Sequence, residues 1–315
     1  MRRFGAIRLQ ALGPVLALLL LGITWGLTMP LTKIAVSGGD HAFGLVVWEL
    51  VVAALLLAAI NLLRRRSFRF RLAHLKMFLF ISLVGNLLPT ILWFVTAAHL
   101  PSGVLSIILS LVPMFALPVA LVLRLERFQW QRLLGVMLGA LAIAFLVGPQ
   151  TSLPNRSDIW FVLLALIAPF CYGIEGNGIA KIGMGGLDPV QMLFGATLFS
   201  LCFAVPLALF SGQWMDILHP WGAAEYALLA TALLTTLAYA GYIWLVGRAG
   251  SVFAAQVSYL VTGFGILWSI LLLSESYSGW VWLSLLLMLA GLFLVQPRRK
   301  QTLVPEAASG DNSTF

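Results

Sequence analysis

The sequence predicts an all-α integral membrane protein with ten transmembrane helices, arranged as two inverted five-helix repeats. Of its 315 residues, 61% are hydrophobic and only 10% are charged, whereas a soluble domain carries about 25% charged residues. Apolar runs of about twenty residues recur along the chain, and each is long enough to cross a hydrocarbon core of about 30 Å. The chain also matches itself approximately at an offset of 149 residues. These three observations predict the fold class.

The apolar runs place the ten spans in chain order. They cover residues 14–36, 42–63, 75–97, 101–123, 131–149, 157–181, 188–210, 222–246, 250–273 and 279–296. Alternating strand-like patterning is absent from the sequence, which argues against an outer-membrane barrel. The polar stretch 150–158 separates a first repeat, 14–149, from a second, 157–296. Residues 297–315 are basic and then polar, and we expect a disordered cytoplasmic tail there.

The self-match fixes how the two repeats relate. Leu121-Val-Leu-Arg-Leu-Glu126 ends the fourth span, and Ile270-Leu-Leu-Leu-Ser-Glu275 ends the ninth. The same offset pairs Ser102 with Ser251. Because five spans is an odd number, the second repeat must be inverted relative to the first, which is the construction of many secondary transporters. We expect the two glutamates to anchor a helix end and its following loop.

The basic residues predict the orientation. The net charge is +8, and with the N-terminus inside nearly all lysines and arginines fall in the cytoplasmic loops and tails. Only Lys33 and Arg156 face the other side. The positive-inside rule therefore predicts a multi-pass protein of the plasma (inner) membrane with both termini cytoplasmic. The basicity orients the chain in the bilayer, so we expect no nucleic-acid partner.

Two acidic residues deep in apolar spans are the best candidates for a functional role, because a buried charge is costly in a membrane. They are Glu49 in the second span and Glu175 in the sixth. For Glu49, an ion pair with Lys33 on the first span is an alternative to a place on the substrate pathway. Glu175 could couple protons or bind a substrate amine. It lies in Gly173-Ile-Glu-Gly-Asn-Gly178, where the glycines favour either local unwinding or close helix packing.

Further side chains near mid-span could line the same pathway. They are Trp25, Ser106, Ser110, Tyr172, Asn177, Tyr239, Gln256 and Tyr259. A buried tyrosine hydroxyl needs a partner, so a polar cavity or a hydrogen bond between helices would suit the tyrosines. The serines could instead bond to the backbone of their own helix. The four histidines show no ligand-like spacing, so we expect no metal site, and nothing predicts a cofactor.

Several weak motifs together resemble the EamA family of the drug/metabolite transporter superfamily. In the first repeat they are Trp25-Gly26, Ser110-Leu-Val-Pro113, Glu126 and the helix with Gly135 and Gly139; in the second they are Tyr172-Gly173, Tyr259-Leu-Val-Thr262, Glu275 and Leu289-Ala-Gly291. The chain departs from the family in two ways. Leu125 and Ser274 stand where a glycine commonly precedes the glutamate, and Glu49 stands in the second span where a basic residue is common. The resemblance implies a ten-span transporter that exports amino acids or related metabolites.

These observations favour a secondary transporter of a small molecule that works by alternating access, with protons as a candidate coupling ion and the lipid bilayer as its surroundings. The sequence contains no P-loop, no His-Glu-x-x-His and no Gly-x-Ser-x-Gly, so we expect no enzymatic activity. A lipid flippase or a non-catalytic membrane partner is the alternative function.

Overall fold

The computed structural model describes residues 2–39, 41–65, 71–149, 155, 157–183, 185–249, 251–254 and 256–295. Within these ranges every regular element is a helix, and no strand occurs. The all-helical prediction is therefore confirmed. The tail expected at 297–315, and residues 150–154 of the polar stretch between the repeats, lie outside the described ranges.

The first repeat contains five helical segments, two of which are interrupted. The uninterrupted helices are α1 (Arg2–Val36), α2 (Ala42–Leu63) and α7 (Trp130–Val147). The third segment consists of η1 (Leu72–His74), α3 (Leu75–Phe80), the π-helix η2 (Ile81–Leu87) and α4 (Leu88–His99). The fourth is divided into α5 (Ser102–Leu109) and α6 (Val112–Val122).

The second repeat also has five helical segments, two of which are interrupted. Its sixth segment is divided into α8 (Asp158–Ala165) and α9 (Ile167–Ile182), and it continues with α10 (Pro189–Phe210), α11 (Ala223–Ala249), α12 (Ser251–Ala254), α13 (Val257–Leu273) and α14 (Gly279–Val295). Helix α10 starts at a capping box, in which the Asp188 carboxylate accepts a hydrogen bond from the Val190 amide at 2.8 Å and Gln191 bonds back to the Asp188 amide at 3.2 Å.

Eight segments of the described chain are long and apolar enough to cross a membrane. Their bounds agree with the predicted spans to within a few residues, from Gly13–Val36 to Ala223–Leu245. Helices α13 and α14 have 17 residues each and are shorter. The protein is thus a multi-pass membrane protein, and the count of ten spans stays a prediction.

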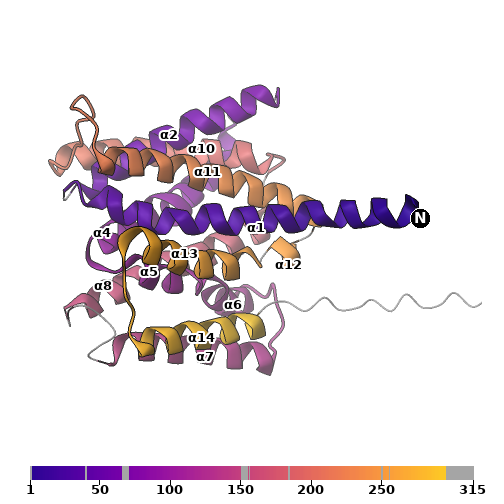
Figure 1. Cartoon of the computed structure of the whole chain (residues 1–315). Coiled ribbons are helices and arrows are strands. Elements are labelled where there is room, and N and C mark those ends of the chain that lie inside the picture. Colours follow the sequence, from indigo (N-terminus) through magenta and orange to yellow (C-terminus); the bar gives the residue numbers. More distant parts are fainter. Residues whose placement is uncertain are drawn as a thin grey trace, which may run out of the picture.

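The helices pack in pairs that reflect the duplication (Figure 1). Helix α1 packs against α13 and α11. Correspondingly, α9, its counterpart in the second repeat, packs against α6 and α4. Other large contacts join counterparts directly, namely α2 with α10, α7 with α14, and α5 with α13, and α2 also packs against α11. For most contacts between the repeats, the equivalent helices of the other repeat form the same contact. This is expected when a pseudo-two-fold axis relates the two repeats.

Small residues allow the closest helix contacts. A Cβ on Gly26 of α1 would lie 2.8 Å from the amide nitrogen of Gly265 in α13, and a Cβ on Gly135 of α7 would lie 2.6 Å from the carbonyl oxygen of Gly291 in α14. Such contacts let backbones approach without a side chain between them. In contrast, large apolar side chains cover the outside of the bundle: Leu55 is 67% and Phe210 92% exposed, a surface suited to lipid rather than water.

The interruptions lie where the sequence or the local geometry breaks the helical hydrogen bonds. Pro113 stands in the first turn of α6 and separates it from α5 at residues 110–111. The third segment changes to π-helix at Ile81–Leu87, a form that occurs mostly as short bulges, frequently at functional sites. The glycine-rich stretch 173–178 remains within the continuous helix α9, so the structure shows packing there and not local unwinding.

Candidate functional site

The two deep acidic residues, one from each repeat, lie near one tyrosine. The hydroxyl of Tyr172 on α9 is within electrostatic range of the carboxyl groups of Glu175, one turn along the same helix, and of Glu49 on α2. The hydroxyl of Tyr239 on α11 is within the same range of Tyr172 and of Glu175. These four side chains belong to α2, α9 and α11, which come from both repeats.

Both carboxyl groups are enclosed by protein, yet neither has a polar partner. Protein atoms surround Glu49 and Glu175, and each residue still keeps some accessible surface. No ion pair or hydrogen bond to either carboxyl group is found among the described residues. Both carboxyl groups are therefore largely shielded by protein without being paired.

Aromatic rings extend the site. Tyr239 lies within electrostatic range of Tyr242, one turn further along α11. The ring of Tyr242 meets the ring of Trp25 edge to face, with centroids 6.3 Å apart. Trp25, Tyr172 and Tyr239 were predicted for the pathway, and this role stays a prediction. Tyr242 was missed by the sequence analysis, although it follows Tyr239 at i+3 and so shares its helix face.

The Glu175 carboxyl group packs against the π-helix. A Cβ on Gly85 of η2 would lie 2.2 Å from the carboxyl carbon of Glu175, so only a glycine leaves room for this side chain in its present position. The next residue, Asn86, donates a hydrogen bond of 3.5 Å to Thr197 of α10. The distorted stretch of the third segment therefore positions one of the two acidic groups.

Asn177 acts in helix packing. Its side-chain amide donates to the carbonyl oxygens of Ala116 at 2.9 Å and Gly173 at 2.8 Å, and so ties α9 to α6. A Cβ on Gly173 would lie 2.9 Å from the Ala116 amide nitrogen, so the two backbones are in close contact here. Asn177 was predicted for the pathway, but these contacts give its amide group a structural role.

Lys33 does not pair with Glu49. Its ammonium group donates to the carbonyl oxygens of Ala97 at 2.8 Å and Ala98 at 3.0 Å, in the last turn of α4. Lysines commonly satisfy carbonyl groups at the C-terminus of a helix, where they also interact with its dipole. The structure therefore does not contain the ion pair between Lys33 and Glu49 that was the alternative.

The other predicted pathway residues have contacts elsewhere. Ser106 and Ser110 bond to carbonyl oxygens of their own helix, those of Ser102 at 3.1 Å and Ile107 at 2.7 Å. Gln256 is exposed at the start of α13. The Tyr259 hydroxyl is buried and has no hydrogen-bond partner among the described residues. Their pathway role stays a prediction.

The two repeated glutamates have different surroundings. Glu275 accepts hydrogen bonds from the amide and hydroxyl groups of Ser102, from the amide of Gly103 and from the hydroxyl of Tyr277, at the N-terminus of α5. Glu126 pairs with the buried Arg132 at 2.9 Å, and its own side chain is 41% exposed. Both glutamates stabilise a helix end, as expected. Glu126 does so within the first repeat, whereas Glu275 of the second repeat caps α5 of the first.

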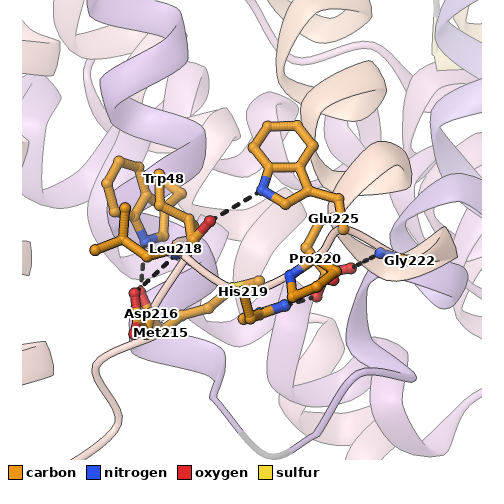
Figure 2. A network of polar contacts seen from close by, with 10 residues as sticks. Trp48, Met215, Asp216, Leu218, His219, Pro220, Gly222 and Glu225 are labelled. Atoms are coloured by element: carbon orange, nitrogen blue, oxygen red, sulfur yellow. Dashed lines mark hydrogen bonds and ion pairs between the residues drawn. The ribbon is translucent and has the colours of Figure 1, made fainter.

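A cavity of about 300 Å³ lies apart from the acidic residues, where the loop between α10 and α11 covers the ends of α1 and α2. Its lining includes Trp214, Asp216, His219 and Glu225. Figure 2 shows that the loop is held to the first turn of α11: His219 lies 3.6 Å from the Glu225 carboxylate, and that carboxylate accepts a hydrogen bond from the Gly222 amide at 2.7 Å. The described residues contain no group of three potential metal ligands.

Comparison with known proteins agrees with the internal duplication. The model of the EamA-like transporter family matches residues 12–148 and, a second time, residues 159–296. The chain belongs to this family. The match covers almost every described helix, so the chain is a membrane transporter built from two EamA units.

The chain is also similar to individual proteins, at modest sequence identity. An uncharacterized protein of Pseudomonas aeruginosa, PA1977, is 33% identical over 55% of this chain, and the match spans only 57% of that relative's length. The uncharacterized transporter YoaV of Bacillus subtilis is 23% identical over 90% of this chain and 95% of its own. One solved crystal structure superposes with a TM-score of 0.61 at 15% identity, covering 90% of this chain and 96% of that chain. The last likeness concerns the fold alone.

Proposed function

We propose that this EamA transporter is a secondary transporter that moves a small metabolite, an amino acid or a related compound, by alternating access between its two repeats. Export is the proposed direction, on the strength of the family resemblance. The observation that carries the proposal is that Glu49 and Glu175, one from each repeat, lie within helices of the bundle without an ion pair or hydrogen bond among the described residues. A polar site at the interface of repeats is where such transporters bind substrate.

The surroundings of the two acidic residues support a transport role over a structural one. A structural carboxylate in an apolar interior is normally paired, because an unpaired one is costly. Glu275 is paired in this way, whereas Glu49 and Glu175 have no polar partner among the described residues. A carboxyl group that binds protons and substrate in turn must stay free of permanent partners.

Reconstitution of the full chain in phosphatidylethanolamine and phosphatidylglycerol vesicles tests the proposal. A panel of amino acids and related metabolites is loaded, and efflux is followed with and without a pH gradient. We expect efflux of some members of the panel, and we expect Glu175→Gln to abolish it or uncouple it from the gradient while leaving the protein in the membrane. Movement of fluorescent lipid without efflux of any metabolite would contradict the proposal.

A further inference from the structure

We propose that two equivalent sets of contacts, one at each end of the bundle, open and close the transport pathway in turn. The outer gate consists of Glu275 and Lys33 with their hydrogen-bond partners. The inner gate consists of the counterparts of these residues, Glu126 and Lys181. The inference rests on the proposed alternating access and names the contacts that exchange. In this structure the outer gate is formed, whereas the described residues of the inner gate have other surroundings.

The outer gate holds the connection between α4 and α5 from two sides. Glu275, which follows α13 of the second repeat, accepts hydrogen bonds from the amide groups of Ser102 at 2.9 Å and Gly103 at 3.3 Å. The hydroxyl oxygens of Ser102 and Ser269 of α13 are 2.7 Å apart. On the other side, Lys33 of α1 donates to two carbonyl oxygens in the last turn of α4. These contacts join the two repeats at the predicted outer side.

The duplication supplies the same residue types at the opposite end. At an offset of 149 residues, Glu126 is the counterpart of Glu275, and Ser251, the first residue of α12, is the counterpart of Ser102. Lys181 is the basic residue in the last turn of α9, as the lysine of the outer gate is in α1. Inverted repeats place equivalent contacts at opposite ends of the bundle, so these residues can close the predicted inner side against α11 and α12.

The described residues of the inner gate make other contacts in this structure. Glu126 pairs with Arg132 of its own repeat at 2.9 Å, and its side chain is 41% exposed. Lys181 is exposed and has no hydrogen bond or ion pair among the described residues. Helix α12 packs against α11, and in the described part of the chain no contact as extensive as that of α5 with α13 joins α12 to α6. The two ends of the bundle therefore differ, as alternating access requires.

The outer gate also has hydrogen-bond donors that the inner gate lacks. The hydroxyl of Tyr277 donates to Glu275, and the residue equivalent to Tyr277 is Phe128. The residue equivalent to Ser269 is Ala120. A phenyl ring and a methyl group cannot replace these hydroxyl groups, so the inner gate forms fewer hydrogen bonds when it closes. The state in which the outer gate is formed should therefore be the more populated one.

Pairs of cysteines measure both gates without a transport assay. The full chain is used in a background in which both native cysteines are replaced by alanine. Ser102→Cys with Ser269→Cys joins two positions whose hydroxyl groups are in contact, and Ser251→Cys with Ala120→Cys is the equivalent inner pair. The protein is oxidised with copper phenanthroline in lipid nanodiscs, and mass spectrometry of its peptides quantifies each disulfide. We expect the outer pair to crosslink rapidly and the inner pair more slowly, because its rate follows the less populated state.

Substitutions in the two gates should change the rate of the inner pair in opposite directions. Glu275→Gln weakens the outer gate, so we expect the inner pair to crosslink up to about tenfold faster, the factor that one hydrogen bond to a charged group is worth. Glu126→Gln should slow the inner pair by about the same factor, and Lys181→Met should slow it as well. Both of these side chains are exposed in this structure, so their replacement leaves the outer gate intact. Glu225→Gln, in the first turn of α11, is the control with unchanged rates.

Oxidation of the outer pair connects the gates to transport. We expect the disulfide between residues 102 and 269 to stop efflux of every metabolite that the wild type exports, and dithiothreitol to restore it. Efflux that continues through the fully oxidised protein would overturn the inference.

The crosslinking results keep this inference separate from the proposed function. An inner pair that never crosslinks, or that crosslinks equally fast in wild type and Glu126→Gln, would overturn the two gates even in a protein that transports. If both pairs crosslinked with the expected rates in a protein that moves no metabolite, the gates would stand and the proposed function would fail.

Discussion

Replacing Glu275 by glutamine should destabilise the protein more than the same replacement at the equivalent Glu126. The Glu275 carboxylate accepts bonds from the Ser102 amide at 2.9 Å, the Ser102 hydroxyl at 3.0 Å and the Gly103 amide at 3.3 Å, and it also accepts from the Tyr277 hydroxyl. Hydrogen bonds to a charged group are worth about 1.5–3 kcal/mol each and are not additive, and a negative charge at a helix N-terminus adds about 0.3–1 kcal/mol.

In glutamine an NH2 group replaces one of the two carboxylate oxygens, so a donor would face the N–H and O–H donors of Ser102, Gly103 and Tyr277. We therefore expect Glu275→Gln to lower the free energy of unfolding by about 3 kcal/mol. At Glu126 the side chain is 41% exposed, and glutamine can still accept the bond from Arg132, so a cost below about 1 kcal/mol follows. Equilibrium unfolding in mixed micelles with increasing dodecyl sulfate, followed by tryptophan fluorescence, measures both. Equal costs for the two variants would refute the reasoning.

Three further predictions concern packing, pairing and pH. Gly135→Ala should lower the free energy of unfolding because its Cβ would lie 2.6 Å from a backbone oxygen of α14, whereas Gly176→Ala, with nothing within 4 Å, should be neutral or stabilising; the same micelle titration compares them. Because Lys33 does not contact Glu49, the unfolding costs of Lys33→Met and Glu49→Gln should add in a double-mutant cycle, and a coupling above about 0.5 kcal/mol would show that they interact. Burial and, after it, the hydrogen bond to Glu275 raise the pKa of Tyr277. The difference in free energy of unfolding between wild type and Tyr277→Phe should therefore be complete below about pH 10 and become smaller at higher pH. Urea unfolding across this pH range measures the difference, and a constant value would contradict the assignment.

The positions of the long helices could be predicted because they depend on local composition. A run of apolar residues of the right length forms a helix in a membrane whatever its neighbours, since every backbone group must find its partner within the segment. The repeat was also visible, because Glu126 and Glu275 follow similar apolar runs. The family match to residues 12–148 and 159–296 confirms this duplication.

The functional site could be predicted only in part. Glu49 and Glu175 were recognisable as unusual by depth and charge alone, but their neighbourhood depends on how α2, α9 and α11 pack across repeats. The partner of Lys33 could not be read from the sequence either, because it is a backbone carbonyl group near residue 97. The π-helix at Ile81–Leu87 has no motif of its own, so the place of Gly85 beside Glu175 appears only in three dimensions.

The two repeats differ most where function is proposed. Near these residues the two repeats align at offsets of 147 and 148 residues. Glu175 then corresponds to Thr28, and Glu49 corresponds to the region of Thr197. Thr28 bonds to the carbonyl oxygen of Trp25 at 2.7 Å, and Thr197 receives the bond from Asn86 at 3.5 Å. The shared residues therefore build the scaffold, whereas the acidic groups occupy positions that the duplication alone does not supply.

Labelling with dicyclohexylcarbodiimide, which reacts with carboxyl groups in apolar surroundings, tests most directly whether Glu49 and Glu175 belong to the substrate pathway. The purified full chain is labelled with and without the metabolite that leaves the vesicles fastest, and mass spectrometry quantifies the adduct at each glutamate. The account predicts that this metabolite protects Glu49 and Glu175 and leaves any adduct at Glu126 unchanged. Labelling of Glu49 and Glu175 that the metabolite leaves unchanged would contradict it.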